Sequence, residues 1–345
     1  MKLNRKVEPE EGIEPSTSFL PRKRSADELL RLINTVLLYI MDKVISSLIA
    51  FLIALVPTSF ILNTPIANNQ TTIIFTGDVM LGRSVMGSAL DNNDNLYPFR
   101  KTSEFLKNAD ITMVNLENPI VKDCARVSGG FKFCTSPDVA KGLSFSGIDI
   151  VSLSNNHSAN YGQSGLSETK KYLDELGIKY VDDSNLEIIE KNGTKFGFLA
   201  FDYTISRNNL DHDLELIKTS DPQIDILIVM PHWGEEYKDT ANKFQVDTAH
   251  RMIENGADII VGSHPHWVQN YEEINPTSPD GLRWARPIYY SLGNFIFDQS
   301  WSEATKKGLV VKMTFDNGEI EKREEFKTYI PQKGQPIIID ESPKE

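Results

Sequence analysis

Acidic, amide and imidazole side chains recur along this chain in six short motifs. The motifs are GD at 77–78, NLE at 115–117, NNH at 155–157, HWGEEY at 232–237, SHPH at 263–266 and SLGNFIFD at 291–298. The first five bring together Asp, Glu, Asn and several His. Divalent metals of the Zn, Mn or Fe type accept imidazole nitrogen and carboxylate oxygen together, and a pair of them can share a carboxylate and activate water. The motifs therefore predict a two-metal site of hydrolase type.

Most of these motifs directly follow an apolar run of the kind found in buried β-strands. Asp78 follows TTIIFTG, Glu117 follows ITMVNL, and three more runs end in histidine. Because open α/β sheets place their ligands at the carboxyl ends of the strands, these polar groups should gather at one edge. The candidate metal ligands are Asp78, Glu117, Asn156, His232, His264 and His266.

A single histidine at a strand end is more often a hydrogen-bonded structural residue than a ligand. Four of the six histidines stand at strand exits here, beside two carboxylates and an amide, and that repetition favours a metal site. His212 and His250 lack such a setting, and we interpret them as structural.

The remaining pattern predicts an α/β fold, because β-type and helical runs alternate along the chain. One domain over residues 71–330, with two apposed sheets flanked by helices, is the simplest interpretation, and the tail 331–345 is expected to be loose. The predicted strands are 71–76, 111–114, 148–153, 224–230, 259–261 and 288–292, with hairpins of 186–190 with 195–201 and 310–315 with 320–327. The predicted helices are 103–107, 137–145, 166–176 and 244–255.

Composition narrows the class of protein and of partner. The chain has 345 residues, 40% hydrophobic and 24% charged, as in soluble globular proteins. A net charge of -12 argues against a nucleic-acid partner, since phosphate backbones are bound by clustered Lys and Arg. An acidic ligand would need a local basic or metal-bearing pocket. The motifs of serine hydrolases, phosphate-binding loops and dinucleotide-binding folds do not occur.

The N-terminal part differs from the rest in composition. We expect residues 1–40 to be disordered. We also expect them to come from an over-long reading frame, because Met41 would be a natural first residue for the apolar segment that follows. Residues 41–67 contain an uncharged apolar run after Lys43, which predicts a secretory signal peptide or an uncleaved membrane anchor. Either alternative places the domain outside the cytoplasm, secreted or anchored to a membrane.

The two cysteines would then meet an oxidising compartment. Cys124 and Cys134 bracket a loop with Gly129-Gly130 at its turn, and a disulfide that closes this loop is the favoured interpretation. The alternative is two unpaired thiols.

Taken in order, GDVMLGR, NLENPI, NNHSANYGQSGL, HWGEEY, GSHPHWVQ and YSLGNFIFD resemble the CapA family of poly-γ-glutamate capsule synthesis proteins. The resemblance runs from about residue 71 to Asp298. It implies the four-layer α-β-β-α sandwich of the calcineurin-like metallophosphoesterases, with two divalent ions (Mn, Zn or Fe). It also implies an acidic polymer or phosphoester as substrate and membrane-bound capsule synthase subunits as partners.

The same resemblance assigns roles to residues of this chain. Glu117 would bridge the metals, and Met80 occupies the place where many relatives have a histidine, so the first ion would take Asp78, Glu117 and His266. Asn156, His232 and His264 would complete the second ion, and His157 would be the catalytic histidine.

Other positions bear on substrate and turnover. Asn160 stands where the family commonly has Asp; either His157 is less basic as a result, or the position tolerates both residues. Arg83, Glu236 and Tyr237 are candidates for substrate binding, although Arg83 could equally form a surface salt bridge.

Three functions therefore remain open at this stage. The protein is a metal-dependent phosphoesterase or amide hydrolase, a polymer-binding subunit of capsule assembly that cleaves nothing, or a fold that has lost its metals.

Overall fold

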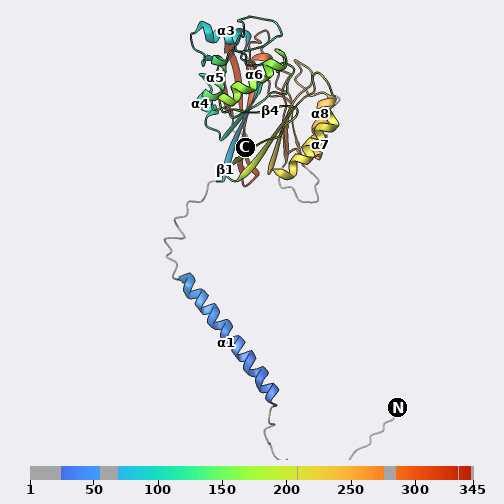
Figure 1. Cartoon of the computed structure of the whole chain (residues 1–345). Helices are drawn as coiled ribbons and strands as arrows, with labels where there is room; N and C mark the ends of the chain where they lie inside the picture. The colour runs from blue at the N-terminus through green and yellow to red at the C-terminus, as the bar shows by residue number, and fades with distance from the viewer. Residues whose placement is uncertain (1–24, 55–68, 208, 276–284, 333, 343–345) are drawn as a thin grey trace, which may run out of the picture. The chain divides into compact units, whose positions relative to one another are not determined.

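A computed structural model describes residues 25–54, 69–207, 209–275, 285–332 and 334–342 of the chain. The chain divides into two compact units, Met1–Ala67 and Asn68–Glu345. The described part of the first unit is a single long helix, α1 (Ala26–Ala54). The second unit contains both sheets and the other helices that the structure describes (Figure 1).

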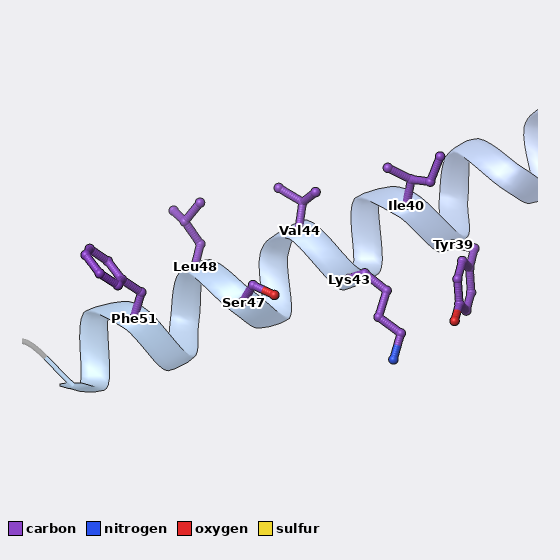
Figure 2. Close-up of a pocket in the computed structure, with 7 residues that line it drawn as sticks. All are labelled: Tyr39, Ile40, Lys43, Val44, Ser47, Leu48 and Phe51. Atoms are coloured by element: carbon purple, nitrogen blue, oxygen red, sulfur yellow. The ribbon is translucent and has the colours of Figure 1, made fainter.

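Helix α1 starts at a conventional cap. The backbone N–H of Glu28 donates to Ser25 Oγ over 3.3 Å, and the acidic residues of the first turn complement the helix dipole. The stretch Ala26–Ile49 is long and apolar enough to cross a membrane, and none of it is buried inside the protein. Figure 2 shows Ile40, Val44 and Leu48 along one side of the helix and Lys43 on another. Such a helix could serve as a signal peptide or as an anchor.

The expectation of disorder over residues 1–40 is wrong for residues 26–40, which belong to α1. The segment LLRLINTVLLYIM is rich in good helix formers, and its apolar side chains continue into the run after Lys43 without a breaker. Residues 1–24 and most of the linker after α1 lie outside the described residues.

The first sheet of the second unit has eight strands within the described residues. In spatial order these are β14 (Gln335–Ser342), β13 (Glu319–Gln332), β12 (Lys307–Asp316), β1 (Gln70–Val79), β2 (Ile111–Leu116), β3 (Ile150–Ser152) and β4 (Lys179–Val181), and β11 (Asn294–Ile296) also pairs with β1. Strands β11, β1, β2, β3 and β4 are parallel, whereas β12 to β14 are antiparallel.

The second sheet has six strands in the part of the chain that the structure describes. In spatial order these are β5 (Glu187–Lys191), β6 (Thr194–Asp202), β7 (Ile226–His232), β8 (Ile259–Val261), β10 (Arg286–Tyr289) and β9 (Tyr271–Ile274). Its central strands β6, β7, β8 and β10 are parallel. Both sheets therefore have a parallel core whose carboxyl ends can carry a site.

Three hydrophobic clusters hold the sheets and helices together. The first packs α3 (Arg83–Asp91), α5 (Pro137–Phe145) and α6 (Gly162–Glu175) on the first sheet, the second lies between the two sheets, and the third packs α7 (Leu210–Ser220) and α8 (Lys243–Glu254) on the second sheet. In β1, Ile74 belongs to the first cluster while Ile73 and Phe75 belong to the second, because alternate strand residues face opposite sides. The fold is mixed α/β with two sheets, and Figure 1 shows α7 and α8 on the opposite side from α3 to α6.

Several predicted elements are confirmed, and helix Pro137–Phe145 and strand Ile259–Val261 have the predicted bounds. The expectation of a loose tail over 331–345 is wrong for Gln335–Ser342, which form β14 against β13. Three consecutive isoleucines at 337–339 suit an edge strand, but the sequence does not show which strand they join. The short helices α3 (Arg83–Asp91) and α4 (Ser103–Leu106) bracket a 3₁₀ turn at Tyr97–Phe99, and the sequence pattern predicts only the second of these helices.

The end of β1 runs against the chain just before β11. The backbone N–H of Asp78 donates to the carbonyl of Gly293 over 2.9 Å, and a Cβ built on Gly77 would stand 1.9 Å from that same oxygen. Glycine is therefore required at position 77 by contact with backbone, which cannot move aside as a flexible side chain could. This close approach sets the position of the Asp78 side chain.

We expect Gly77→Ala to destabilise the second unit by about 1–3 kcal/mol, the usual range for overpacking a tight contact. The measurement is the urea midpoint of unfolding. Gly129→Ala is the control, because no heavy atom lies within 4 Å of a Cβ at that position. Equal midpoints for the two variants would contradict the assignment of a backbone clash at Gly77.

Candidate metal centre

Three buried side chains form the centre of the candidate site. Asp78 lies at the end of β1, Glu117 directly follows β2, and His266 lies in the turn after β8. Each offers one ligand atom, and these atoms all lie within 4.8 Å of one another. This group could hold a metal ion, since a mixed carboxylate and imidazole set suits Zn, Mn or Fe.

The carboxylate oxygens of this group are not satisfied by the protein. Asn115 Nδ2 donates to Asp78 Oδ1 over 2.8 Å, but Asp78 Oδ2 and both Glu117 oxygens are buried without a hydrogen-bond partner. His266 Nδ1 lies 3.2 Å from Asp78 Oδ2 and 3.0 Å from Asn294 Oδ1, and it has at most one hydrogen for these two acceptors. A buried carboxylate oxygen that lacks a partner costs the full loss of its hydration. A cation among the three side chains would supply the missing interaction, so the residues present fit a metal.

The electrostatics of the group lead to the same conclusion. Burial raises the pKa of Glu117 well above its ordinary value, and the neighbouring carboxylates of Asp78 and Glu236 add to this, against the effect of His266. Burial opposes ionisation of His266, but the carboxylates of Glu117 and Asp78 outweigh it and raise the pKa to about 9. Without a cation the group therefore retains protons that a metal would replace.

A second group of side chains lies beside the first. His232 Nε2 is 3.0 Å from Asn156 Oδ1, and the rings of His232 and His264 are 4.8 Å apart between centroids. The His264 ring lies 6.1 Å from that of His266. Asn115 Nδ2 is 2.8 Å from Asp78 Oδ1 and 3.3 Å from His232 Nδ1, so one amide links both groups.

These two histidines are held in the form that binds metals. Burial lowers the pKa of His232 well below its usual value, and the nearby His264 lowers it further. Burial and His266 lower the pKa of His264 to about 4. Neutral imidazole is the ligand form, and His232 Nδ1 is oriented by Ser263 Oγ at 2.8 Å.

The turn that carries His264 and His266 has a strained backbone. Their φ angles are 95° and 57°, in the left-handed region that side chains other than glycine rarely adopt. The turn is fixed at its start by Ser263, whose N–H donates to Pro231 O over 3.0 Å, and at its far side by the N–H of Tyr237, which donates to Pro265 O over 2.8 Å. Such strain persists only where surrounding contacts hold it, and it is concentrated at functional sites.

His157 stands at the edge of the first group. Its Nε2 is 3.9 Å from Glu117 Oε1, and its Nδ1 is 3.1 Å from Asn160 Oδ1. Asn160 Oδ1 also accepts the backbone N–H of Phe133 over 2.6 Å, and the Phe133 ring stacks on His157 at 3.9 Å. Because an amide oxygen only accepts, this contact assigns the proton of a neutral His157 to Nδ1 and leaves Nε2 free to accept one. Burial lowers the pKa of His157, against the effect of its hydrogen bond to Asn160.

The disulfide loop forms one wall beside His157. Cys124 and Cys134 are joined by a disulfide bond, with 5.8 Å between their Cα atoms. Phe133, next to Cys134, also lies under the guanidinium of Arg83, 4.4 Å from the ring centroid. The loop therefore holds one ring between the imidazole and the guanidinium.

The three candidates for substrate binding lie in different settings. Arg83 pairs with Asp298 and donates to Gly130 O over 3.0 Å, so its charge is already engaged inside the protein. The Tyr237 ring lies 6.0 Å from that of His266, next to an exposed Trp301. Glu236 is exposed. Burial of Tyr237 raises the pKa of its hydroxyl, and the negative charge of Glu236 raises it further.

Three more side chains singled out in the sequence lie outside the group of Asp78, Glu117 and His266. Met80 belongs to the first hydrophobic cluster, where its sulfur accepts the N–H of Gly82 over 3.1 Å. His212 and His250 pair with Asp213 and Glu272. None of the three therefore supplies a ligand to the candidate centre.

Sequence reasoning missed three residues that orient the site. Asn115 and Ser263 lie within motifs already singled out and could have been found from their strand-end position, whereas nothing in the sequence marks Phe133.

Comparisons with known proteins match this chain to one family and to two Bacillus relatives whose names agree with that family. The family model described as bacterial capsule synthesis protein PGA_cap matches residues 72–299. The chain is 30% identical over 279 residues to the capsule biosynthesis protein CapA of Bacillus anthracis, covering 73% of this chain and 66% of that protein. It is 30% identical over 268 residues to the PGA biosynthesis protein CapA of Bacillus subtilis (strain 168), covering 71% and 68%. The chain thus spans about two thirds of the length of these curated relatives.

Solved structures are more distant. A hypothetical protein from Thermus thermophilus aligns over 75% of this chain and 100% of its own, with 14% identity and a TM-score of 0.48. A second protein from the same organism aligns over 71% of this chain and 98% of its own, with 11% identity and a TM-score of 0.40.

Removing metal should make stability depend on pH between 6.5 and 9. The pKa of His266 rises from 6.5 to about 9 on folding. Its contribution to stability is therefore fully present below pH 6.5 and is lost as the pH rises through 9. The raised pKa of Glu117 acts in the same direction, while His232 and His264 titrate below this window. We therefore expect the urea midpoint of chelator-treated protein to fall across the window.

Glu117→Gln should flatten this dependence, because it removes one of the two carboxylates that hold the proton on His266. His250→Ala changes a histidine outside the site and should keep the slope of the unmodified chain. An unchanged slope in Glu117→Gln would show that the proton is not held by this group.

Proposed function

Because this chain belongs to the family of bacterial capsule synthesis proteins PGA_cap, we propose that it acts in the synthesis or export of a poly-γ-glutamate capsule. The family match covers every motif, since all six lie between residues 77 and 298. The names of the two Bacillus relatives support this role.

The proposed architecture is the four-layer α-β-β-α sandwich of calcineurin-like metallophosphoesterases. Three observations support it: one hydrophobic cluster lies between the sheets, and each sheet packs a set of helices on its other face. In such a sandwich the parallel strands of both sheets bring their carboxyl ends to one side.

The proposed metal centre contains two divalent ions, Mn, Zn or Fe. The first would be held by Asp78, Glu117 and His266, and the second by Glu117 together with Asn156, His232 and His264. The observation that carries this proposal is the set of buried carboxylate oxygens on Asp78 and Glu117 without partners. When bound, such ions polarise a substrate oxygen and activate water.

The residues of the chain would orient the ligands and move a proton. Asn115 fixes Asp78, Ser263 fixes His232, and Asn294 Oδ1 lies 3.0 Å from His266 Nδ1. His157, with its proton on Nδ1 and Nε2 toward Glu117, is placed to accept a proton at Nε2 and return it to a leaving group.

Two versions of this function differ in whether a bond is broken. The buried imidazole of His157, oriented by Asn160 and Phe133, favours a hydrolase that acts on a phosphoester or on the amide bonds of the polymer. The apolar helix α1 favours a membrane-held subunit outside the cytoplasm that binds the acidic polymer and works with membrane-bound capsule synthase subunits. A secreted form would follow if α1 were removed.

Metal analysis of the purified chain tests the centre itself. We expect about two ions per chain in the unmodified protein, by analogy with two-metal hydrolases. Asp78→Asn and His232→Ala should each lose metal, because each removes a ligand of a different ion. His250→Ala, outside the site, should keep full content. Equal metal content in all four proteins would exclude both metal-based functions.

Cleavage assays separate the hydrolase from the binding subunit. With a generic phosphodiester and with γ-linked glutamate polymer as substrates, we expect metal-dependent cleavage of one of them, and His157→Ala should lower kcat about 10²- to 10⁴-fold. Asn160→Asp should raise the rate of cleavage or leave it unchanged. A carboxylate there would still accept the N–H groups of Phe133 and His157, and it would make His157 more basic.

A large loss in Asn160→Asp would contradict the proposed role of that oxygen. Cleavage of neither substrate by metal-loaded protein would assign the non-catalytic role instead.

A further inference from the structure

A pocket of about 430 Å³ opens beside His264. It is lined by residues 203–207, which follow β6, by Gly234, which follows β7, and by His264, which follows β8. Three neighbouring parallel strands therefore end around it. One of its walls is a candidate metal ligand, so whatever the pocket binds lies next to the metal centre.

The base of this pocket is tied to the strand that carries His232. The N–H of Tyr203 donates to His232 O over 2.9 Å. The backbone and hydroxyl of Thr204 both donate to Asp202 Oδ1, at 2.9 Å and 2.6 Å, and the Tyr203 hydroxyl donates to the carboxylate of Asp213. Because these contacts fix the loop at its start, the pocket has a defined position relative to the second group of ligands.

Arg207 gives the pocket an uncommitted positive charge. Its guanidinium lies 4.0 Å from the centroid of the Phe244 ring on the first turn of α8, and it takes part in no ion pair among the described residues. Arg100 also lies over a phenylalanine ring, at 5.3 Å, but it is paired with Asp94 over 2.8 Å. In a chain of net charge -12, an arginine that lines a pocket and has no acidic partner among the described residues is suited to an anionic ligand.

We propose that this pocket binds a carboxylate of the γ-linked glutamate polymer, with Arg207 as the residue that recognises it. The inference rests on the proposed function and names where the substrate chain lies. Each unit of a γ-linked polymer keeps one free carboxylate, and the planar guanidinium can donate two parallel hydrogen bonds to it. The linkage also places two methylene groups in the polymer backbone, and Ile205, 78% exposed in the same loop, offers them an apolar contact. A bound carboxylate here would bring the adjacent amide toward His264 and the metals.

Equilibrium binding to the full-length chain, purified in detergent and loaded with metal, tests this directly. The probes are a synthetic γ-linked glutamate hexamer and inorganic phosphate, titrated at one fixed ionic strength. We expect Arg207→Ala to weaken hexamer binding about tenfold or more, as loss of a charged hydrogen-bonding group does. Arg207→Lys should recover part of the affinity, because it keeps the charge but not the fork.

Arg100→Ala is the matched control, since it removes an arginine over a phenylalanine ring outside the pocket, and it should bind the hexamer like the unmodified chain. Metal content of Arg207→Ala should be unchanged, which shows that the variant folds and keeps the neighbouring ligands.

Three results would overturn the inference. Unchanged hexamer affinity in Arg207→Ala would remove Arg207 from recognition while leaving the proposed function intact. Weaker phosphate binding with unchanged hexamer binding would make the pocket a phosphate site. No hexamer binding by the unmodified chain would instead reject the proposed function on which the inference rests.

Discussion

Two carboxylates are buried side by side in this protein without enough hydrogen bonds to satisfy them. Asp78 and Glu117 are fully buried, three of their four oxygens lack a partner, and a third acidic group, Glu236, adds to the negative potential. An unpaired buried charge costs on the order of several kcal/mol, so the fold tolerates it only if positive charge arrives. His266 supplies one proton in the absence of a metal. The rest of the site is arranged around this requirement.

The surrounding structure meets the requirement by bringing both sheets to one edge. β1 and β2 of the first sheet deliver the carboxylates, whereas β7 and the turn after β8 of the second sheet deliver the imidazoles. Asn115 contacts side chains from both sheets, at Asp78 and at His232. Two backbone features fix the positions of these side chains. Position 77 admits only glycine, and the turn at His264 and His266 adopts strained φ angles.

Much of this site could be predicted from the sequence, because the motifs end apolar strands and the carboxyl ends of parallel strands converge. The structure brings Asp78, Glu117 and His266 together as that pattern requires. What could not be predicted depends on long-range packing. The partner of Arg83 is Asp298, 215 residues away, and the stack of Phe133 on His157 depends on how a disulfide loop folds back. The helix over residues 26–40 has enough helix formers to be predicted, but the mixed polar composition before it favours disorder when the whole segment is averaged.

Two ions that share Glu117 are proposed to bind to Asp78, Asn156, His232, His264 and His266. The most direct test is X-ray diffraction from metal-loaded crystals at the absorption edge of the bound metal. We expect two anomalous peaks about 3.5–4 Å apart, as in two-metal hydrolases, one beside Asp78 and His266 and the other beside His232 and His264. A single peak, or none near Glu117, would contradict it.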